Sequence, residues 1–223
     1  MIELDHLVVA CSSLEAGRLW CEATLGVAPQ PGGRHPLMGT HNLLLALASD
    51  RHPRAYLELI AIDPDARLPA QPRWYDLEDP ALQAAISSGP RLVHWVARCD
   101  DIEATAAALR SAGDDPGTIV PVERMTPRGM LRWRMTVPRD GRRPCGGAMP
   151  LWIQWSNGHP TEALPPSSVS IESLEIGGVA ADLAAHVARA ATVAVADAEA
   201  PLRAVLAAPR GRVILTAPDR LSA

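Results

Sequence analysis

The sequence contains no lysine and no phenylalanine, and each absence limits what the protein does or how it is built. Without lysine, Schiff-base catalysis and lysine general-base catalysis are excluded. Without phenylalanine, the core must be filled by leucine, valine, isoleucine and tryptophan. Four cysteines are present, and because no two of them are spaced C-x-x-C we expect no zinc knuckle.

A large excess of charge and long apolar runs are also missing. The formal net charge of −4 argues against nucleic-acid binding, which needs a clustered basic face. No apolar run approaches the roughly 20 residues that span a bilayer, and no basic segment or signal-peptide core precedes the first strand pattern. We therefore expect a cytoplasmic protein that binds neither nucleic acid nor membrane. A length of 223 residues allows one large domain or two small ones.

A short pattern occurs twice, and each copy begins with a histidine. Residues 6–16, His-Leu-Val-Val-Ala-Cys-Ser-Ser-Leu-Glu-Ala, align without a gap to residues 94–104, His-Trp-Val-Ala-Arg-Cys-Asp-Asp-Ile-Glu-Ala. Each copy reads as an apolar strand, a polar turn and the start of a helix. Each is followed later by an apolar strand with one polar residue inside it, Glu58 in the first and Gln154 in the second. Such an internal repeat decides the fold.

The repeat divides the chain into a first unit at 1–62, a connector at 63–90 and a second unit at 91–160. In the first unit we predict strands near 4–10, 40–47 and 54–62, a helix that Gly26 ends, and a loop at 29–33. In the second we predict strands near 91–98, 118–125, 131–137 and 149–156, a helix over 102–112 and a basic, glycine-rich loop at 139–147. The connector carries a short helix near 80–87.

A weaker third copy covers residues 168–223, with its first strand at Ile171. The run 173–183 keeps the register of the first two copies, with Ser173 where they have histidine. A helix over 180–190 and short strands near Val193, Val205 and Val213 complete this unit. Because its last strand has no carboxylate, we expect it to serve packing.

Each unit is thus a strand, a helix and about three strands, which makes the fold class α+β. Side chains alternate between the faces of a strand, so His6 shares a face with Val8, and Glu58 shares one with Tyr56. Glu58 lies between two leucines, and a carboxylate there is costly to bury without a partner.

The histidine-led first strand, the helix ended by glycine and the Tyr-Leu-Glu-Leu strand at 56–59 resemble the vicinal oxygen chelate superfamily. That superfamily includes glyoxalase I, extradiol dioxygenases, methylmalonyl-CoA epimerase and bleomycin-resistance proteins. With Gly-Arg-His-Pro at 33–36 and Gly-Thr-His-Asn at 39–42, the chain is most similar to the glyoxalase-like domain branch. The resemblance implies paired βαβββ modules that curl into a cup-shaped sheet, followed by a degenerate third module.

In that superfamily, metal ligands come from the first and last strands of each module. The resemblance assigns first-strand positions to His6 and His94, the last-strand carboxylate to Glu58, and the matching position to Gln154, where the family usually has glutamate. Two imidazoles and a carboxylate suit a divalent metal, here Fe, Mn, Ni or Zn. Glutamine is a weaker ligand, which could coordinate, bind a metal-bound water or mark a site that has lost its metal. Histidines kept for packing after duplication are the rival explanation.

Further residues are candidates for substrate binding. His35, His41 and Asn42 lie in a loop and strand that could roof the cup. Arg132 and Arg134 alternate with Trp133, so both project to one face, where they would either bind an anionic substrate or form a solvated surface.

Three functions follow from this site. The first is a metal-dependent lyase, isomerase or dioxygenase, in which the metal polarises two neighbouring oxygens of a small substrate and Glu58 or Gln154 assists proton movement. The alternative is a metal-free, bleomycin-resistance-like cup that binds a small flat or anionic molecule, which Gln154 favours. The third is a scaffold with an idle cup. Two modules in one chain allow a monomer, although homodimers are common in the superfamily.

Overall fold

The computed structural model describes residues 2–47, 50, 52–126, 128–188, 193–195 and 200–218. The first module consists of β1 (Ile2–Ala10), α1 (Leu14–Thr24), β2 (Gln30–His35), β3 (Thr40–Ala46) and β4 (Tyr56–Ile62). The second consists of β5 (Arg91–Cys99), α3 (Ile102–Ser111), β6 (Thr118–Thr126), β7 (Gly129–Val137) and β8 (Leu151–Asn157). Ser13 and Asp101 accept backbone hydrogen bonds as the N-caps of α1 and α3, and α3 starts at Ile102, where the sequence predicts it.

The predicted loop at 29–33 is wrong, because all but its first residue lie in β2. This strand pairs antiparallel with β3. It lies at the edge of its sheet, where a proline and two glycines are tolerated because one side of the strand needs no ladder bonds. The same residues that suggested a loop therefore mark an edge strand.

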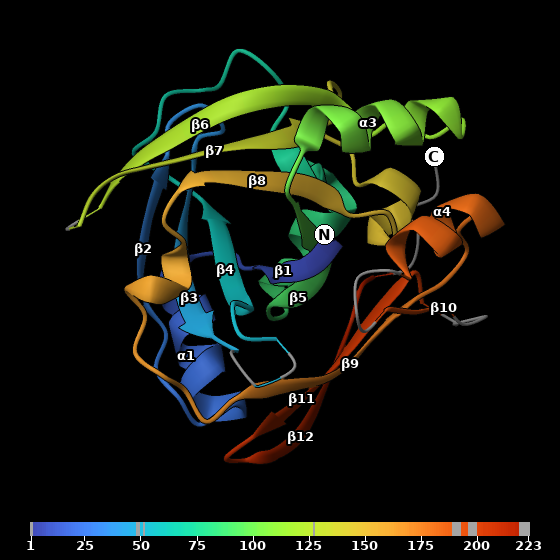
Figure 1. The fold of residues 1–223 in the computed structure, drawn as a ribbon. Helices are drawn as coiled ribbons and strands as arrows, with labels where there is room; N and C mark the ends of the chain where they lie inside the picture. Colours follow the sequence, from blue (N-terminus) through green and yellow to red (C-terminus); the bar gives the residue numbers. More distant parts are fainter. Residues whose placement is uncertain are drawn as a thin grey trace.

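The two modules join into one sheet with the order β2-β3-β4-β1-β5-β8-β7-β6. They meet where β1 pairs antiparallel with β5. The sheet curls until its edge strands β2 and β6 come into contact, so that it nearly closes (Figure 1). The predicted α+β cup of paired βαβββ modules is confirmed.

The connector fills the concave side of this cup. It contains a 3₁₀ turn at Trp74–Asp76 and the helix α2 (Pro80–Ser87), the latter where the sequence predicts it. Tyr75 and Leu82 belong to the same buried cluster as Val8 of β1 and Trp133 of β7. The convex face packs against α1, α3 and the third module in a separate core.

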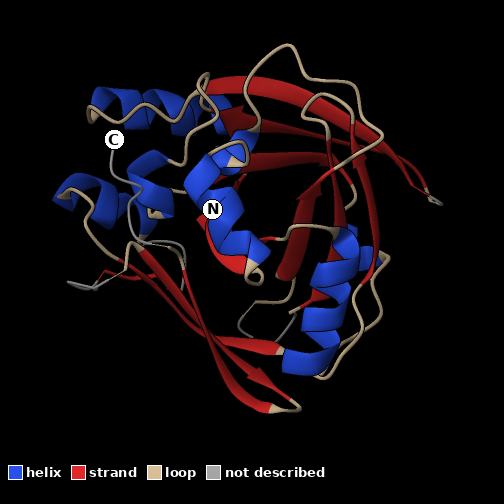
Figure 2. Ribbon diagram, turned by 180° about the vertical axis from the view of Figure 1, so that it is seen from behind, coloured by secondary structure: helices blue, strands red, loops and turns tan. Residues whose placement is uncertain are grey.

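The third module forms a four-stranded sheet in the order β10-β9-β11-β12, seen as the lower strands in Figure 2. Its elements are β9 (Ser170–Ile176), α4 (Ala181–Val187), β10 (Val193–Val195), β11 (Leu202–Ala208) and β12 (Gly211–Thr216). The module is degenerate because its strand order differs from that of the first two modules. Here β11 pairs with the side of β9 that β10 leaves open. The last two residues of the predicted helix over 180–190 lie outside the described residues. Among the residues described, no helix is long and apolar enough to cross a membrane.

A β-bulge precedes the repeated position in all three modules. In the ladder between β1 and β5, Asp5 is unpaired directly before His6, and Val93 is unpaired directly before His94. In β9 the unpaired residue directly precedes Ser173. A bulge changes the direction in which the neighbouring side chains point. The three modules therefore share this backbone irregularity, but the side chains that it orients are different.

Candidate functional site

Strand pairing identifies which residue of the second module is equivalent to Glu58. In the parallel pair β1–β4, Val8 lies opposite Glu58. In the parallel pair β5–β8, Val96, which matches Val8 in the repeat, lies opposite Leu151. The structural equivalent of Glu58 is therefore Leu151. The sequence alignment, which paired Glu58 with Gln154, is offset from it by three residues along β8. The sequence comparison matched polar residue to polar residue, whereas ladder register is set by the whole strand.

Gln154 lies on the convex side of the sheet, outside the cup. Its amide oxygen accepts a hydrogen bond from the Ile102 backbone N–H at 3.3 Å, and its amide nitrogen donates to the Asp100 carbonyl at 2.6 Å. The Arg134 guanidinium also donates to its oxygen at 2.7 Å. Gln154 thus ties the last strand of the second module to the start of α3.

His6 is held in the cup by the residue that precedes it. The Nδ1 atom of His6 lies 2.7 Å from Oδ1 of Asp5. In a regular strand these neighbours would point to opposite faces, and the bulge at Asp5 brings them together. The sequence analysis missed Asp5 because it assumed strict alternation.

Asp5 is completely buried and accepts three hydrogen bonds from side chains. Besides His6, the donors are Trp155 Nε1 at 2.9 Å and His159 Nε2 at 3.1 Å. Burial alone would raise the pKa of Asp5, but the hydrogen bonds from His159 and His6 outweigh it and hold the pKa below its usual range. Asp5 is therefore ionised, and as a pure acceptor it requires a proton on His6 Nδ1.

This arrangement leaves Nε2 of His6 facing Glu58. The Nε2 atom lies 3.6 Å from Glu58 Oε2, and both side chains are almost completely buried. The other carboxylate oxygen, Oε1, accepts a hydrogen bond from the Asn42 amide at 2.5 Å. The first module thus places a base and a carboxylate face to face.

Asn42 is the residue that organises the polar end of the cup. Its amide nitrogen donates to Glu58 and contacts Nε2 of His35 at 3.4 Å. Its oxygen accepts from the Gly33 backbone N–H at 2.8 Å and from Arg124 at 3.3 Å. Because both ends of the amide are satisfied, only one orientation of Asn42 fits.

His35 is a neutral acceptor in this network. Burial first, and then the nearby charge of Arg124, lower its pKa to about 3. Its Nδ1 lies 3.0 Å from the Thr40 hydroxyl, and its ring meets the edge of Trp74. His35 therefore supports Asn42 without carrying charge.

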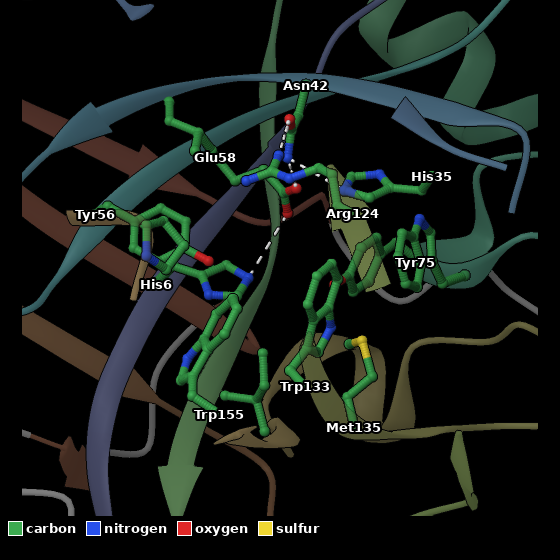
Figure 3. A pocket seen from close by; sticks show the side chains of 14 residues that line it. His6, His35, Asn42, Tyr56, Glu58, Tyr75, Arg124, Trp133, Met135 and Trp155 are labelled. Atoms are coloured by element: carbon green, nitrogen blue, oxygen red, sulfur yellow. Dashed lines mark hydrogen bonds and ion pairs between the residues drawn. The ribbon is translucent and has the colours of Figure 1, made fainter. Parts of the chain in front are cut away.

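The polar end opens onto an aromatic pocket (Figure 3). Its walls include Tyr56, which stacks on His6 at a centroid distance of 4.5 Å, with Trp133 and Trp155 opposite Glu58 and Asn42. The cavity volume is about 30 Å³, which accommodates one or two waters. Only a small group of atoms fits there without movement of the walls.

His94 faces the cup but is separated from this cluster. Its Nε2 accepts a hydrogen bond from the Leu151 backbone N–H at 3.1 Å, and the ring of Tyr75 lies against it at 5.3 Å. Burial, together with the charge of Arg143, lowers its pKa well below the ordinary value. With Val93 in place of Asp5 and Leu151 in place of Glu58, the second half-site lacks the carboxylates of the first.

Three predicted substrate-binding residues lie on the convex side. His41 pairs with Ala61 in the ladder and approaches Asp63 at 3.9 Å, away from the pocket. Arg132 forms an ion pair with Glu123 at 3.2 Å, and Arg134 forms one with Glu103 at 3.2 Å. Of the five candidates, the structure brings only His35 and Asn42 into the pocket.

Arg124 takes the place that the sequence analysis gave to Arg132 and Arg134. It lies opposite Leu131 in the β6–β7 ladder, and Leu131 faces the cup. The alternation on β6 was available from the sequence, but that strand carries many polar residues and offers no apolar face that identifies its inner side.

The residues present do not fit the divalent metal that the superfamily resemblance implies. Of the expected ligands, His6 and Glu58 face each other, His94 Nε2 is occupied by Leu151, and Gln154 lies outside the cup. Within the described part of the chain, no three His, Cys, Asp or Glu residues are grouped to hold a metal ion. We therefore derive no step through a metal.

A curled sheet of paired modules with a buried histidine–carboxylate cluster defines a cup-shaped fold with an internal pocket. The glyoxalase-like domain family model matches residues 4–192. The chain therefore belongs to the glyoxalase-like domain family, within the glyoxalase/vicinal oxygen chelate superfamily. No curated protein matches the sequence.

Solved structures with the same fold have low sequence identity. A hypothetical protein from Staphylococcus aureus is 15% identical, with a TM-score of 0.55 over 97% of this chain and 86% of that chain. Methylmalonyl-CoA epimerase from Mycobacterium tuberculosis is 20% identical, with a TM-score of 0.40 over 72% of this chain and 91% of that one. The first likeness shows the fold.

Proposed function

We propose that the cup binds a small carbonyl compound and transfers a proton at the carbon next to the carbonyl group, using His6 and Glu58 without a metal. The observation that carries this proposal is the 3.6 Å separation of His6 Nε2 and Glu58 Oε2 inside an aromatic pocket. The reaction class is that of a lyase or isomerase. The protein would act in the cytoplasm as a monomer or homodimer.

Asp5 prepares His6 for this role. An ionised carboxylate on Nδ1 fixes the tautomer, so the lone pair of Nε2 points into the pocket as a general base. Asp5 does not touch the pocket's ligand and is a positioning residue. The three hydrogen bonds that it accepts keep it from taking the proton itself.

Glu58 supplies a carboxylate beside the proton-carrying atom of His6. Because Glu58 Oε1 accepts a hydrogen bond from Asn42, Oε2 is the oxygen that faces His6. When His6 Nε2 takes up a proton, the negative charge of the Glu58 carboxylate stabilises the imidazolium. His6 Nε2 takes the proton from one position, and the resulting imidazolium, paired with the Glu58 carboxylate, returns it at another. The small cavity limits the group that reaches His6 to a few atoms, such as a carbonyl group and its neighbouring carbon.

The test is hydrogen exchange of candidate substrates in D₂O, followed by proton NMR. Hydroxyacetone, pyruvate and acetoacetate are incubated with the wild-type protein and with the His6→Asn and Glu58→Gln variants. Wild type should exchange the acidic C–H of at least one compound faster than buffer, and each variant should slow this by about 10²- to 10⁴-fold. Exchange no faster than buffer with all three compounds, or equal rates in the folded variants, would overturn the proposal.

A metal-dependent reaction is the second candidate, favoured by one observation. His6 Nε2 and Glu58 Oε2 present a nitrogen and an oxygen donor toward each other. Protein purified without chelators, and protein loaded with Fe(II), Mn(II), Ni(II) or Zn(II), should be analysed for bound metal. We expect far less than one ion per chain. Near-stoichiometric metal that is lost in both His6→Ala and His94→Ala would establish the metal-dependent reaction instead.

A further inference from the structure

A larger cavity adjoins the inner pocket. It has a volume of about 420 Å³ and runs between β2, the β6–β7 hairpin and the segment after β8. Its walls include Pro31, Met130, Leu131 and Leu164. We name it the outer cleft. A volume of this size takes an aromatic ring or a short chain, which the inner pocket does not.

Arg124 lies at the junction of the two spaces. Together with Leu44 and Pro160 it lines both the inner pocket and the outer cleft. A Cβ atom at Gly33 would lie 2.4 Å from Arg124 Cδ, so the side chain crosses the seam between β2 and β6 against bare backbone. Glycine at 33 thus makes room for the arginine.

The charge of Arg124 has no counter-ion among the described residues. Its one hydrogen bond there runs from NH1 to the neutral Asn42 oxygen at 3.3 Å, and its Nε is buried without a hydrogen-bond partner. Arg132 and Arg134 on the adjacent strand both pair with glutamates. A half-buried guanidinium with an unused donor is unfavourable unless an acceptor reaches it, and an anion is the strongest such acceptor.

We propose that Arg124 is the oxyanion-binding residue of the ligand, so the substrate is a carboxylate or phosphate whose apolar body occupies the outer cleft. A planar guanidinium pairs with either oxyanion through two parallel N–H bonds. The oxyanion then lies next to Asn42, which in turn contacts Glu58 beside His6. This inference rests on the proposed function for where the reacting carbon goes, but the binding itself does not require it.

The test measures binding of three probes that share a phenyl ring. Phenylacetate and phenyl phosphate carry the oxyanion, and phenylacetamide is the neutral control. Binding is followed by tryptophan fluorescence, since Trp133 and Trp155 line the inner pocket, and by the arginine Nε–H resonances. Wild type should bind at least one oxyanion about 10- to 100-fold more tightly than the amide. The stronger of the two oxyanions identifies the ligand as a carboxylate or a phosphate.

Matched variants locate the effect. Arg124→Gln should abolish the preference, and Arg124→Lys, which keeps the charge without the planar fork, should retain part of it. Arg132→Gln, on the convex face, should leave it within a few-fold of wild type. Arg128 also lines the outer cleft, but its guanidinium donates to the Glu162 carbonyl, so Arg128→Gln should reduce the preference less than Arg124→Gln does. Equal binding of acid and amide by wild type, no shift of the Arg124 Nε–H at saturating phenylacetate and phenyl phosphate, or loss of the preference in Arg128→Gln instead would overturn the inference.

The same proteins separate this inference from the proposed function. Oxyanion binding that depends on Arg124, with no hydrogen exchange by wild type, would leave the binding site standing and remove the proton-transfer chemistry. Hydrogen exchange by a wild-type protein that shows no preference for the oxyanions would support the proton-transfer chemistry and remove the oxyanion site.

Discussion

Oδ1 of Asp5 lies 2.7 Å from Nδ1 of His6, although the two residues are neighbours in one strand. The β-bulge before His6 makes this contact possible. The same bulge precedes His94, where the unpaired residue is Val93. The same β-bulge therefore places a carboxylate beside the histidine in the first module and a valine before the histidine in the second.

Replacing Asp5 tests how strongly this pair holds the cup together. Asp5→Asn removes a buried charge that accepts three hydrogen bonds, so the free energy of unfolding in urea should fall by about 2 kcal/mol. Asp140→Asn, at an exposed carboxylate, should change it by less than about 0.5 kcal/mol. Equal effects of the two substitutions would contradict the role given to Asp5.

The two adjacent glycines of β2 should differ in their tolerance of a methyl group. A Cβ at Gly32 would meet the Asn42 side-chain oxygen at 2.0 Å and the Asn42 carbonyl at 3.0 Å, whereas at Gly33 it meets the long Arg124 side chain. Gly32→Ala should therefore lower the free energy of unfolding by about 1–3 kcal/mol, and Gly33→Ala by less. A larger loss for Gly33→Ala would show that Arg124, rather than Asn42, is the rigid partner.

Gln154 should matter for stability and not for activity. Gln154→Ala removes the hydrogen bond to the Ile102 backbone at the start of α3 and should destabilise the protein by about 1 kcal/mol. Hydrogen exchange of the substrates should be unchanged, with Ser87→Ala in α2 as a surface control. Lost exchange at unchanged stability would return Gln154 to the site.

The repeat predicts two equivalent modules, because eleven aligned residues in each copy fix the register of His6 and His94, and the family resemblance implies the cup. It also predicts that Glu58 joins His6. It does not identify Leu151 as the equivalent of Glu58, since no second residue of β8 matches the first module and fixes the pairing of β8 with β5. The sequence does not show that Asp5 and Arg124 point into the cup. For Asp5 the direction depends on a β-bulge, and for Arg124 it depends on which face of β6 is the inner one.

Stability should depend on pH through His35. Its pKa is lowered to about 3 by burial, whereas an unfolded histidine has a pKa of about 6.5. The unfolded state therefore binds a proton that the native state excludes, so stability is complete above about pH 6.5 and falls toward pH 3 by up to about 1.4 kcal/mol per pH unit. Asp5 has a lowered pKa and acts only below about pH 4.

The His35→Gln variant provides the control for this dependence. Urea unfolding of wild type and variant at about pH 7.5 and about pH 5 should show a smaller loss on acidification in the variant. An identical loss in both proteins would mean that other groups take up the proton.

The comparison of His6→Asn with His94→Asn tests the central claim most directly. Both variants are measured for hydrogen exchange of hydroxyacetone, pyruvate and acetoacetate after circular dichroism has confirmed that they fold. The account predicts that His6→Asn slows exchange by about 10²-fold or more while His94→Asn stays within a few-fold of wild type. Equal losses in the two variants would contradict it, because both half-sites would then share the chemistry.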